Sequence, residues 1–205
     1  MYFSSDEKRI AFPERRENRD PMKKPVGNEI SLKLEKLSYE LRQETDYNSI
    51  FSLVKRAVKT FTGKERAGLG LALADLPPQL GAFWEVGGNY IVINKNLLSS
   101  LKAANRSPIE INSYVFVILM HEYLHSLGFL DELSTRAVTA KICKGIFEEG
   151  HPARLLSEKD PWQVYPFLMH APAGKWEGVK IVDNFDRNFT SYKDISKKAP
   201  AFRRG

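Results

Sequence analysis

Two histidines stand four positions apart in the stretch ILMHEYLHSLGFLDE, which runs from Ile118 to Glu132. Residues four apart on a helix lie on one face, one turn above the other, so His121 and His125 can present ring nitrogens to one point. Glu122 is offset by about 100° around the helix, so it can reach a water molecule at that point without binding the metal. The spacing therefore predicts two metal ligands and a neighbouring general base.

This set of residue types is suited to hydrolysis at a single zinc ion. A catalytic zinc site has three protein ligands and a fourth place for water, whose pKa falls to about 7. A carboxylate such as Glu122 can take a proton from that water, and the hydroxide attacks a carbonyl group that the ion polarises. The carboxylate then returns the proton to the leaving amine. The other interpretation is that His121 and His125 are core side chains hydrogen-bonded to backbone or water.

The segment HEYLHSLGFLD, from His121 to Asp131, resembles the long zinc motif of the metzincin metallopeptidases, HExxHxxGxxH, in its aspartate-ended variant. The resemblance implies that Gly128 turns the chain so that Asp131 returns as the third zinc ligand. It also implies a methionine turn beneath the metal, which YPFLMHAP supplies with Met169. Several metzincin branches have a tyrosine two residues after that methionine, where this chain has Ala171. A transition-state donor must then come from elsewhere, and the candidates are Tyr165 and His170.

The third ligand has an alternative assignment. Asp131 begins the segment DELSTRAVTAKICKGIF, which predicts another helix, and its carboxylate could be the N-cap of that helix. A glutamate would then complete a gluzincin-like site. The candidates are Glu132, Glu148 and Glu149, with His151 less favoured.

A helix of about twenty residues should carry the two histidines. Ser107 suits its N-cap, Pro108 its first position and Glu110 the third position of a capping box, while Gly128 suits the residue that ends it. The segment between these signals is apolar on nearly all sides. We therefore expect it to be the central, buried helix of the domain.

The other elements indicate an α+β fold. Amphipathic patterns in residues 29–45 and 48–63 predict helices that cover a sheet, and residues 69–76 and 82–94 predict strands. The second of these strand segments predicts a hairpin with a tight primed turn at Gly87 and Gly88, since both glycines can take the positive φ that this turn requires. Residues 88–96 are either the edge strand to which an extended peptide adds or an interior strand. The expected architecture is a small mixed β-sheet packed on the central zinc-binding helix, as in metzincins.

Length and composition favour one domain. The chain has 205 residues, 42% of them hydrophobic, which is enough for a single sizeable core in residues 29–205, ending in a basic tail. Residues 1–28 mix both charge signs with few large apolar side chains and predict an arm. A lone cysteine, Cys143, excludes an internal disulfide framework, and no segment has membrane-spanning character. We expect a cytoplasmic protein with no membrane partner.

The net charge of +6 and the pI of about 9.3 raise the question of a nucleic-acid partner. Basic and acidic residues are interleaved through most of the chain, which favours an ordinary solvated surface. The expected partner is therefore a protein or peptide substrate of a zinc-dependent peptidase. Two rival hypotheses are a basic nucleic-acid-associated protein and a non-catalytic zinc module with His170 or His151 as a fourth ligand.

Overall fold

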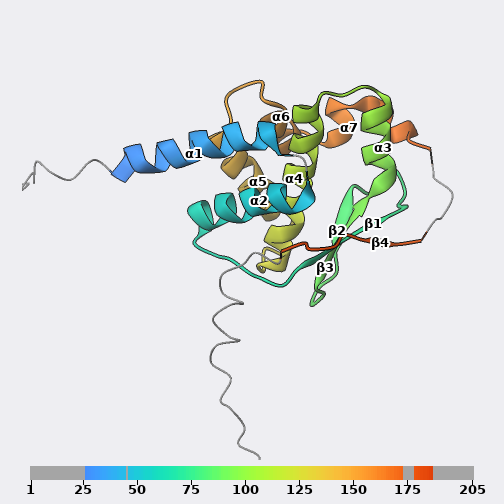
Figure 1. The fold of residues 1–205 in the computed structure, drawn as a ribbon, viewed down its shortest axis with the longest axis horizontal. Helices are drawn as coiled ribbons and strands as arrows, with labels where there is room; N and C mark the ends of the chain where they lie inside the picture. The colour runs from blue at the N-terminus through green and yellow to red at the C-terminus, as the bar shows by residue number, and fades with distance from the viewer. Residues whose placement is uncertain (1–25, 45, 173–177, 187–205) are drawn as a thin grey trace, which may run out of the picture.

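The computed structural model describes residues 26–44, 46–172 and 178–186, and Figure 1 shows their arrangement. The predicted arm, residues 1–28, lies almost entirely outside this part of the chain, as does the basic tail. The elements are α1 (Val26–Gln43), α2 (Tyr47–Thr62), β1 (Gly70–Ala74), β2 (Ala82–Trp84), β3 (Tyr90–Asn94), α3 (Lys95–Ala103), α4 (Pro108–Ser126), α5 (Glu132–Ile146), α6 (Pro152–Glu158), α7 (Pro161–Val164), the 3-10 helix η1 (Pro166–His170) and β4 (Lys180–Ile181).

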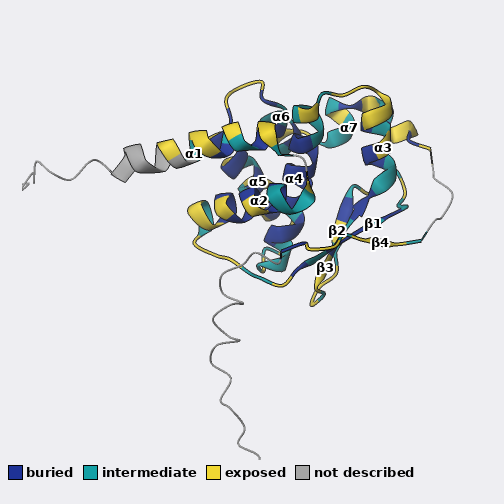
Figure 2. Cartoon of the chain, in the orientation of Figure 1, coloured by how far each residue is buried: buried dark blue, intermediate teal, exposed yellow. Residues whose placement is uncertain are grey.

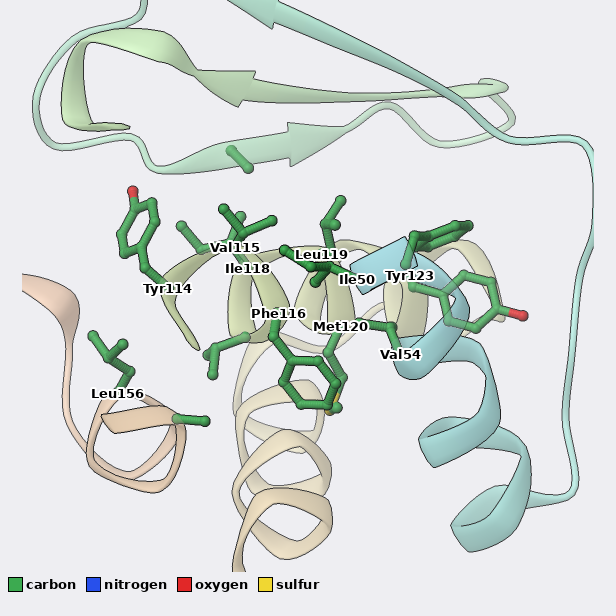
Figure 3. Packing of buried hydrophobic residues seen from close by; sticks show 14 of the residues in the cluster. Ile50, Val54, Tyr114, Val115, Phe116, Ile118, Leu119, Met120, Tyr123 and Leu156 are labelled. Carbon is green, nitrogen blue, oxygen red and sulfur yellow. The ribbon is translucent and has the colours of Figure 1, made fainter. Parts of the chain in front are cut away.

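Helix α4 occupies the centre of the core, as its sequence predicts. In Figure 3, Val115 and Ile118 lie on the side of α4 that faces the strands, whereas Phe116 and Met120 lie on the opposite side. Burying one such side chain contributes about 2 kcal/mol to folding. Figure 2 shows that α4 is buried along most of its length. The helix is apolar on all sides because it is covered by the sheet on one side and by helices on the other.

The predicted signals at the helix ends are largely present. The carboxylate of Glu110 accepts hydrogen bonds from the main-chain N–H of Ser107, at 2.9 Å, and from its hydroxyl, at 2.7 Å. Helix α2 begins after Asp46, whose side chain accepts from the N–H of Ser49 at 2.9 Å, and ends at Gly63 with φ of 69°. These contacts satisfy backbone groups that have no partner inside the helices.

The sheet is small and mixed, with strand order β2-β3-β1-β4. Strand β1 pairs in parallel with β3, whereas β2 pairs antiparallel with β3 and β4 pairs antiparallel with β1. The hairpin between β2 and β3 exists, but the expected two-glycine primed turn is wrong. Only Gly87 takes a positive φ, of 82°, and the N–H of Gly88 donates to the carbonyl oxygen of Glu85 at 2.8 Å. This arrangement has the form of a type II turn, which requires one left-handed residue.

The structure corrects one expectation about the layers and decides another. Helices α1 and α2 pack mainly against α4 and α5 rather than covering the sheet, because α4 itself lies against β2 and β3. Strand β3 is an interior strand, and β2 forms the edge beside it. In the part of the chain that the structure describes, no helix is long and apolar enough to cross a membrane.

Candidate metal centre

Three side chains from α4 and α5 converge on one point. The Nε2 atoms of His121 and His125 lie 3.1 Å apart, and each lies 3.3 Å from Oε2 of Glu132. Tetrahedral ligands about 2.1 Å from a zinc ion lie about 3.4 Å from one another. The three atoms therefore form a triangle of the size that one zinc ion requires. Among the described residues they are the group of His, Cys, Asp and Glu side chains that could hold a metal.

A backbone carbonyl group sets the proton position on His125. Its Nδ1 lies 2.7 Å from the carbonyl oxygen of Phe129. That oxygen can only accept, so Nδ1 carries a proton, and in the tautomer with no proton on Nε2 the lone pair of Nε2 is directed at the shared point. Gly128 makes this contact possible, because its φ of 95° turns the chain back over the end of α4. The turn expected at Gly128 is therefore present.

The carboxylate in the cluster belongs to Glu132, and Asp131 has a different place. Oδ2 of Asp131 accepts a hydrogen bond from the N–H of Ser134 at 2.7 Å, so Asp131 is the N-cap of α5. This contact lowers the pKa of Asp131. The structure does not bring Asp131 together with the histidines, because its carboxylate is used at the start of the helix. Glu132 is one of the three glutamates that the gluzincin-like alternative offered as the third ligand.

The other candidate ligands lie elsewhere in the described chain. Glu148 and Glu149 follow the far end of α5, about 20 Å along its axis from Glu132. His151 is the N-cap of α6, where its Nδ1 accepts from the N–H of Ala153 at 3.1 Å. None of these three side chains belongs to the cluster.

The protonation states of the cluster suit a metal. Burial lowers the pKa of His121 more than the nearby charge of Glu132 raises it, so the imidazole is neutral at pH 7. Burial raises the pKa of Glu132, but the hydrogen bond from Arg136 and the positive charge that His121 gains in acid, where Glu132 titrates, outweigh it, and the net shift is downward. A neutral imidazole and an ionised carboxylate are the forms that bind a divalent cation.

Glu122 is the buried carboxyl group beside this cluster, with 7% of its surface exposed. Burial raises its pKa to about 8 and the charge of Glu132 adds to this effect, while the main-chain N–H of Trp84, which donates to the carboxylate, opposes it. A cation held by the neighbouring ligands would favour the ionised form. The group is thus placed to gain and lose a proton near neutral pH.

An open cleft of about 590 Å³ runs past the cluster. One wall is β2 with the turn after it, the floor is α4, and the other wall runs from α5 to α7. The side chains that line it include His121, Glu122, His125 and Glu132, together with Phe83, Trp84 and Val86 from the first wall and Arg136, Asp160 and Trp162 from the second. The site therefore has room for an extended chain beside an edge strand.

Arg66 fixes the first wall to the end of α4. Its guanidinium group donates to the carbonyl oxygen of Gly88 at 3.1 Å and to Oδ1 of Asn89 at 2.8 Å. The N–H of Arg66 also donates to the hydroxyl of Tyr123, one turn before the end of α4, at 2.7 Å. The sequence indicated a role for neither Arg66 nor Arg136. The partners of Arg66 come from distant segments of the chain. The contact of Arg136 with the cluster depends on which carboxylate faces the histidines.

The residues expected as methionine turn and as donor lie away from the cleft. Met169 is 42% exposed on η1, and neither it nor His170 lines the cleft. The buried Tyr165 places its hydroxyl 3.3 Å from Oε1 of Glu110, about 16 Å along α4 from His121. Among the described residues that line the cleft, the cationic side chains are those of Arg136 and Lys159.

The comparisons with known proteins add no family to this picture. The chain matches no protein-family model, and neither the curated proteins nor the solved structures contain a match to it. The interpretation of the site consequently depends on its own geometry and chemistry.

Proposed function

We propose that this protein is a zinc-dependent peptidase in which His121, His125 and Glu132 hold one zinc ion and Glu122 is the general base. The convergence of two Nε2 atoms and one carboxylate oxygen within 3.1–3.3 Å of one another is the observation that carries the proposal. The fixed tautomer of His125 supports it, because a ring nitrogen with a free lone pair is what a metal ligand needs.

The division of roles follows from position. When bound, zinc supplies a Lewis acid that makes water a nucleophile near neutral pH and polarises the carbonyl group of the substrate. Glu122 lies buried next to the ligands, where it takes the proton of the attacking water and delivers it to the leaving amine. Its raised pKa in the metal-free protein suits a group that holds the proton between these two steps.

The substrate in this proposal is an extended peptide bound along β2. The strand pairs with β3 on one side only, and its other edge borders the cleft. An extended chain can add to such an edge through main-chain hydrogen bonds, which gives affinity without demanding one sequence. The metzincin-like packing stays part of the proposal, because the edge strand β2 lies beside the helix that carries the histidines. The third ligand in the proposal is Glu132 and not the expected Asp131. A cytoplasmic location stays part of the proposal, supported by the single buried cysteine.

The variant Glu122→Gln tests the proposal directly. It should retain zinc and the fold but lose about 100-fold to 10,000-fold in peptide hydrolysis, because the amide cannot accept a proton. Zinc content by metal analysis and cleavage of a mixed peptide library by mass spectrometry are the measurements.

Glu149→Gln is the matched control, because Glu149 is an exposed glutamate that does not line the cleft. It should cleave the library as the unaltered protein does. Equal hydrolysis by Glu122→Gln would exclude the assigned base. Tight zinc binding by the unaltered protein with no cleavage of any peptide would instead favour the non-catalytic zinc module.

A further inference from the structure

The two oxygens of the Glu132 carboxylate have different partners. Oε2 faces the two imidazoles at 3.3 Å, whereas Oε1 accepts a hydrogen bond from Nε of Arg136 at 2.9 Å. Arg136 lies one turn after Glu132 on α5, where the guanidinium group can reach the carboxylate from the side away from α4. The guanidinium contact therefore reserves one oxygen and leaves the other for the histidines.

Arg136 is held in turn by another part of the same wall of the cleft. Its Nη1 lies 2.6 Å from Oδ1 of Asp160, the residue that precedes α7. The chain Asp160–Arg136–Glu132 thus links the segment between α6 and α7 to the metal cluster. A planar guanidinium group can serve two carboxylates at once with fixed geometry, which a lysine cannot do.

We propose that Arg136 is a positioning residue that holds Glu132 as a ligand through one oxygen, and that Asp160 keeps Arg136 in place. This inference rests on the proposed zinc function. Glu132 needs such support because 55% of its side chain is exposed, so without a partner it would sample several rotamers in water. Partners of this kind orient metal ligands, and their removal typically weakens metal binding about 10-fold to 100-fold.

The charge of Arg136 and its contact with Glu132 have opposite effects on zinc affinity. A positive group close to the cluster repels a divalent cation, so loss of the charge alone would tighten zinc binding. Positioning and charge therefore predict opposite signs for the same variant. The sign of the change in zinc affinity separates the two effects.

The test compares Arg136→Ala with Arg154→Ala in the full chain. Arg154 makes the same type of pair, with Nε 3.0 Å from Oε1 of Glu158 one turn later, but on α6 and outside the cluster. Zinc affinity is measured by competition with a chromophoric chelator. We expect Arg136→Ala to bind zinc about 10-fold to 100-fold more weakly. Arg154→Ala should stay within about twofold of the unaltered protein, because its pair contacts none of the three clustered side chains.

Two further variants separate geometry from charge. Arg136→Lys keeps the charge but loses the fork, and Asp160→Asn leaves Arg136 with one anionic partner. Asp160→Asn should weaken zinc binding by less than Arg136→Ala does, whereas Arg136→Lys should weaken it at least as much, because it keeps the repulsive charge without the fork. The unfolding temperatures of the metal-free forms of Arg136→Ala and Arg154→Ala should agree, which excludes a general loss of structure as the cause.

The failures of the inference and of the proposed function are distinguishable. Unchanged or tighter zinc binding by Arg136→Ala, with tight binding by the unaltered protein, would overturn the positioning role and leave the zinc site intact. Absence of zinc binding by the unaltered protein would overturn the proposed function itself.

Discussion

Asp131 and Glu132 are adjacent carboxylates to which the fold gives different partners. The carboxylate of Asp131 accepts the N–H of Ser134 at the start of α5, whereas that of Glu132 turns toward His121 and His125. Consecutive residues at a helix start point in directions about 100° apart, so both cannot face α4. An N-cap needs a short side chain, whereas the place beside the two histidines needs one that reaches across to the next helix.

The pair Asp131→Asn and Glu132→Gln discriminates the two assignments. Asparagine is as good an N-cap as aspartate, so Asp131→Asn should keep both the stability and the zinc affinity of the protein. Glu132→Gln removes the anionic ligand and should weaken zinc binding by more than the about 100-fold that loss of a supporting partner causes. Isothermal titration with zinc measures both. The reverse ranking of the two variants would return the ligand role to Asp131.

The helices around the cleft begin at capping residues, of which the sequence indicated those of α4 and α5 but not that of α6. Ser107 and Glu110 start α4, Asp131 starts α5 and His151 starts α6. His151 stacks on Phe147 with ring centroids 4.3 Å apart and caps α6 through Nδ1. This role as a hydrogen-bond acceptor in a buried place requires the neutral ring. His151 is not a ligand candidate in the structure because it lies outside the cluster of His121, His125 and Glu132.

Acid should therefore destabilise the start of α6. Burial, and then the charge of Arg42, lowers the pKa of His151 to about 4 in the folded protein, below its usual value near 6.5. The folded state binds this proton more weakly than the unfolded state, so stability is present above pH about 6.5 and is lost as the pH falls toward 4. The loss attributable to His151 is at most about 3 kcal/mol.

The variant His151→Asn checks this expectation. Asparagine keeps a capping acceptor but does not titrate, so the free energy of unfolding of the variant should fall less between about pH 6.5 and about pH 4. Urea unfolding of the metal-free proteins at both pH values is the measurement. Other titrating groups are common to both proteins, and identical pH dependence would show that His151 does not carry the effect.

At the scale of the whole molecule, the segment 178–186 closes the fold by returning to the first half of the chain. Its strand β4 pairs with β1, and the carboxylate of Asp186 accepts from Nζ of Lys55 at 2.5 Å and from the N–H of Gly68 at 2.8 Å. The side chains of Lys55 and Asp186 are only 6% and 3% exposed. Burial lowers the pKa of Lys55, and Asp186 opposes this shift. Each charge thus depends on the other to remain buried.

Asp186→Asn should destabilise the protein by about 3–5 kcal/mol, because it removes the carboxylate charge from a buried ion pair with Lys55. Asp183→Asn, at an exposed aspartate in the same segment, is the control and should change stability by less than about 0.5 kcal/mol. Denaturant unfolding measures both. The folded Asp186→Asn protein should bind zinc as before, since Asp186 does not line the cleft. A loss below about 1 kcal/mol would contradict a dependent buried pair.

The sequence by itself determined what depends on neighbours along the chain. The shared helix face of His121 and His125, the place of Glu122 between them and the caps of α4 and α5 follow from helix periodicity and from hydrogen bonds that span three or four residues. It also predicted an α+β fold with a small mixed sheet on a central helix, since an apolar helix needs cover on every side.

Only the tertiary structure decided which carboxylate meets the histidines and which strand forms the edge of the cleft. It also decided which arginines contact that carboxylate and the turn after that strand. Glu132 faces α4 because of the direction in which α5 leaves the turn at Gly128. If α5 were rotated about its axis by one residue, another side chain would face the histidines. The contact of Arg66 with Gly88 spans 22 residues of the chain and that of Arg136 with Asp160 spans 24. Such contacts have no periodic signature, because the packing of separate elements, and not the local backbone, brings their partners together.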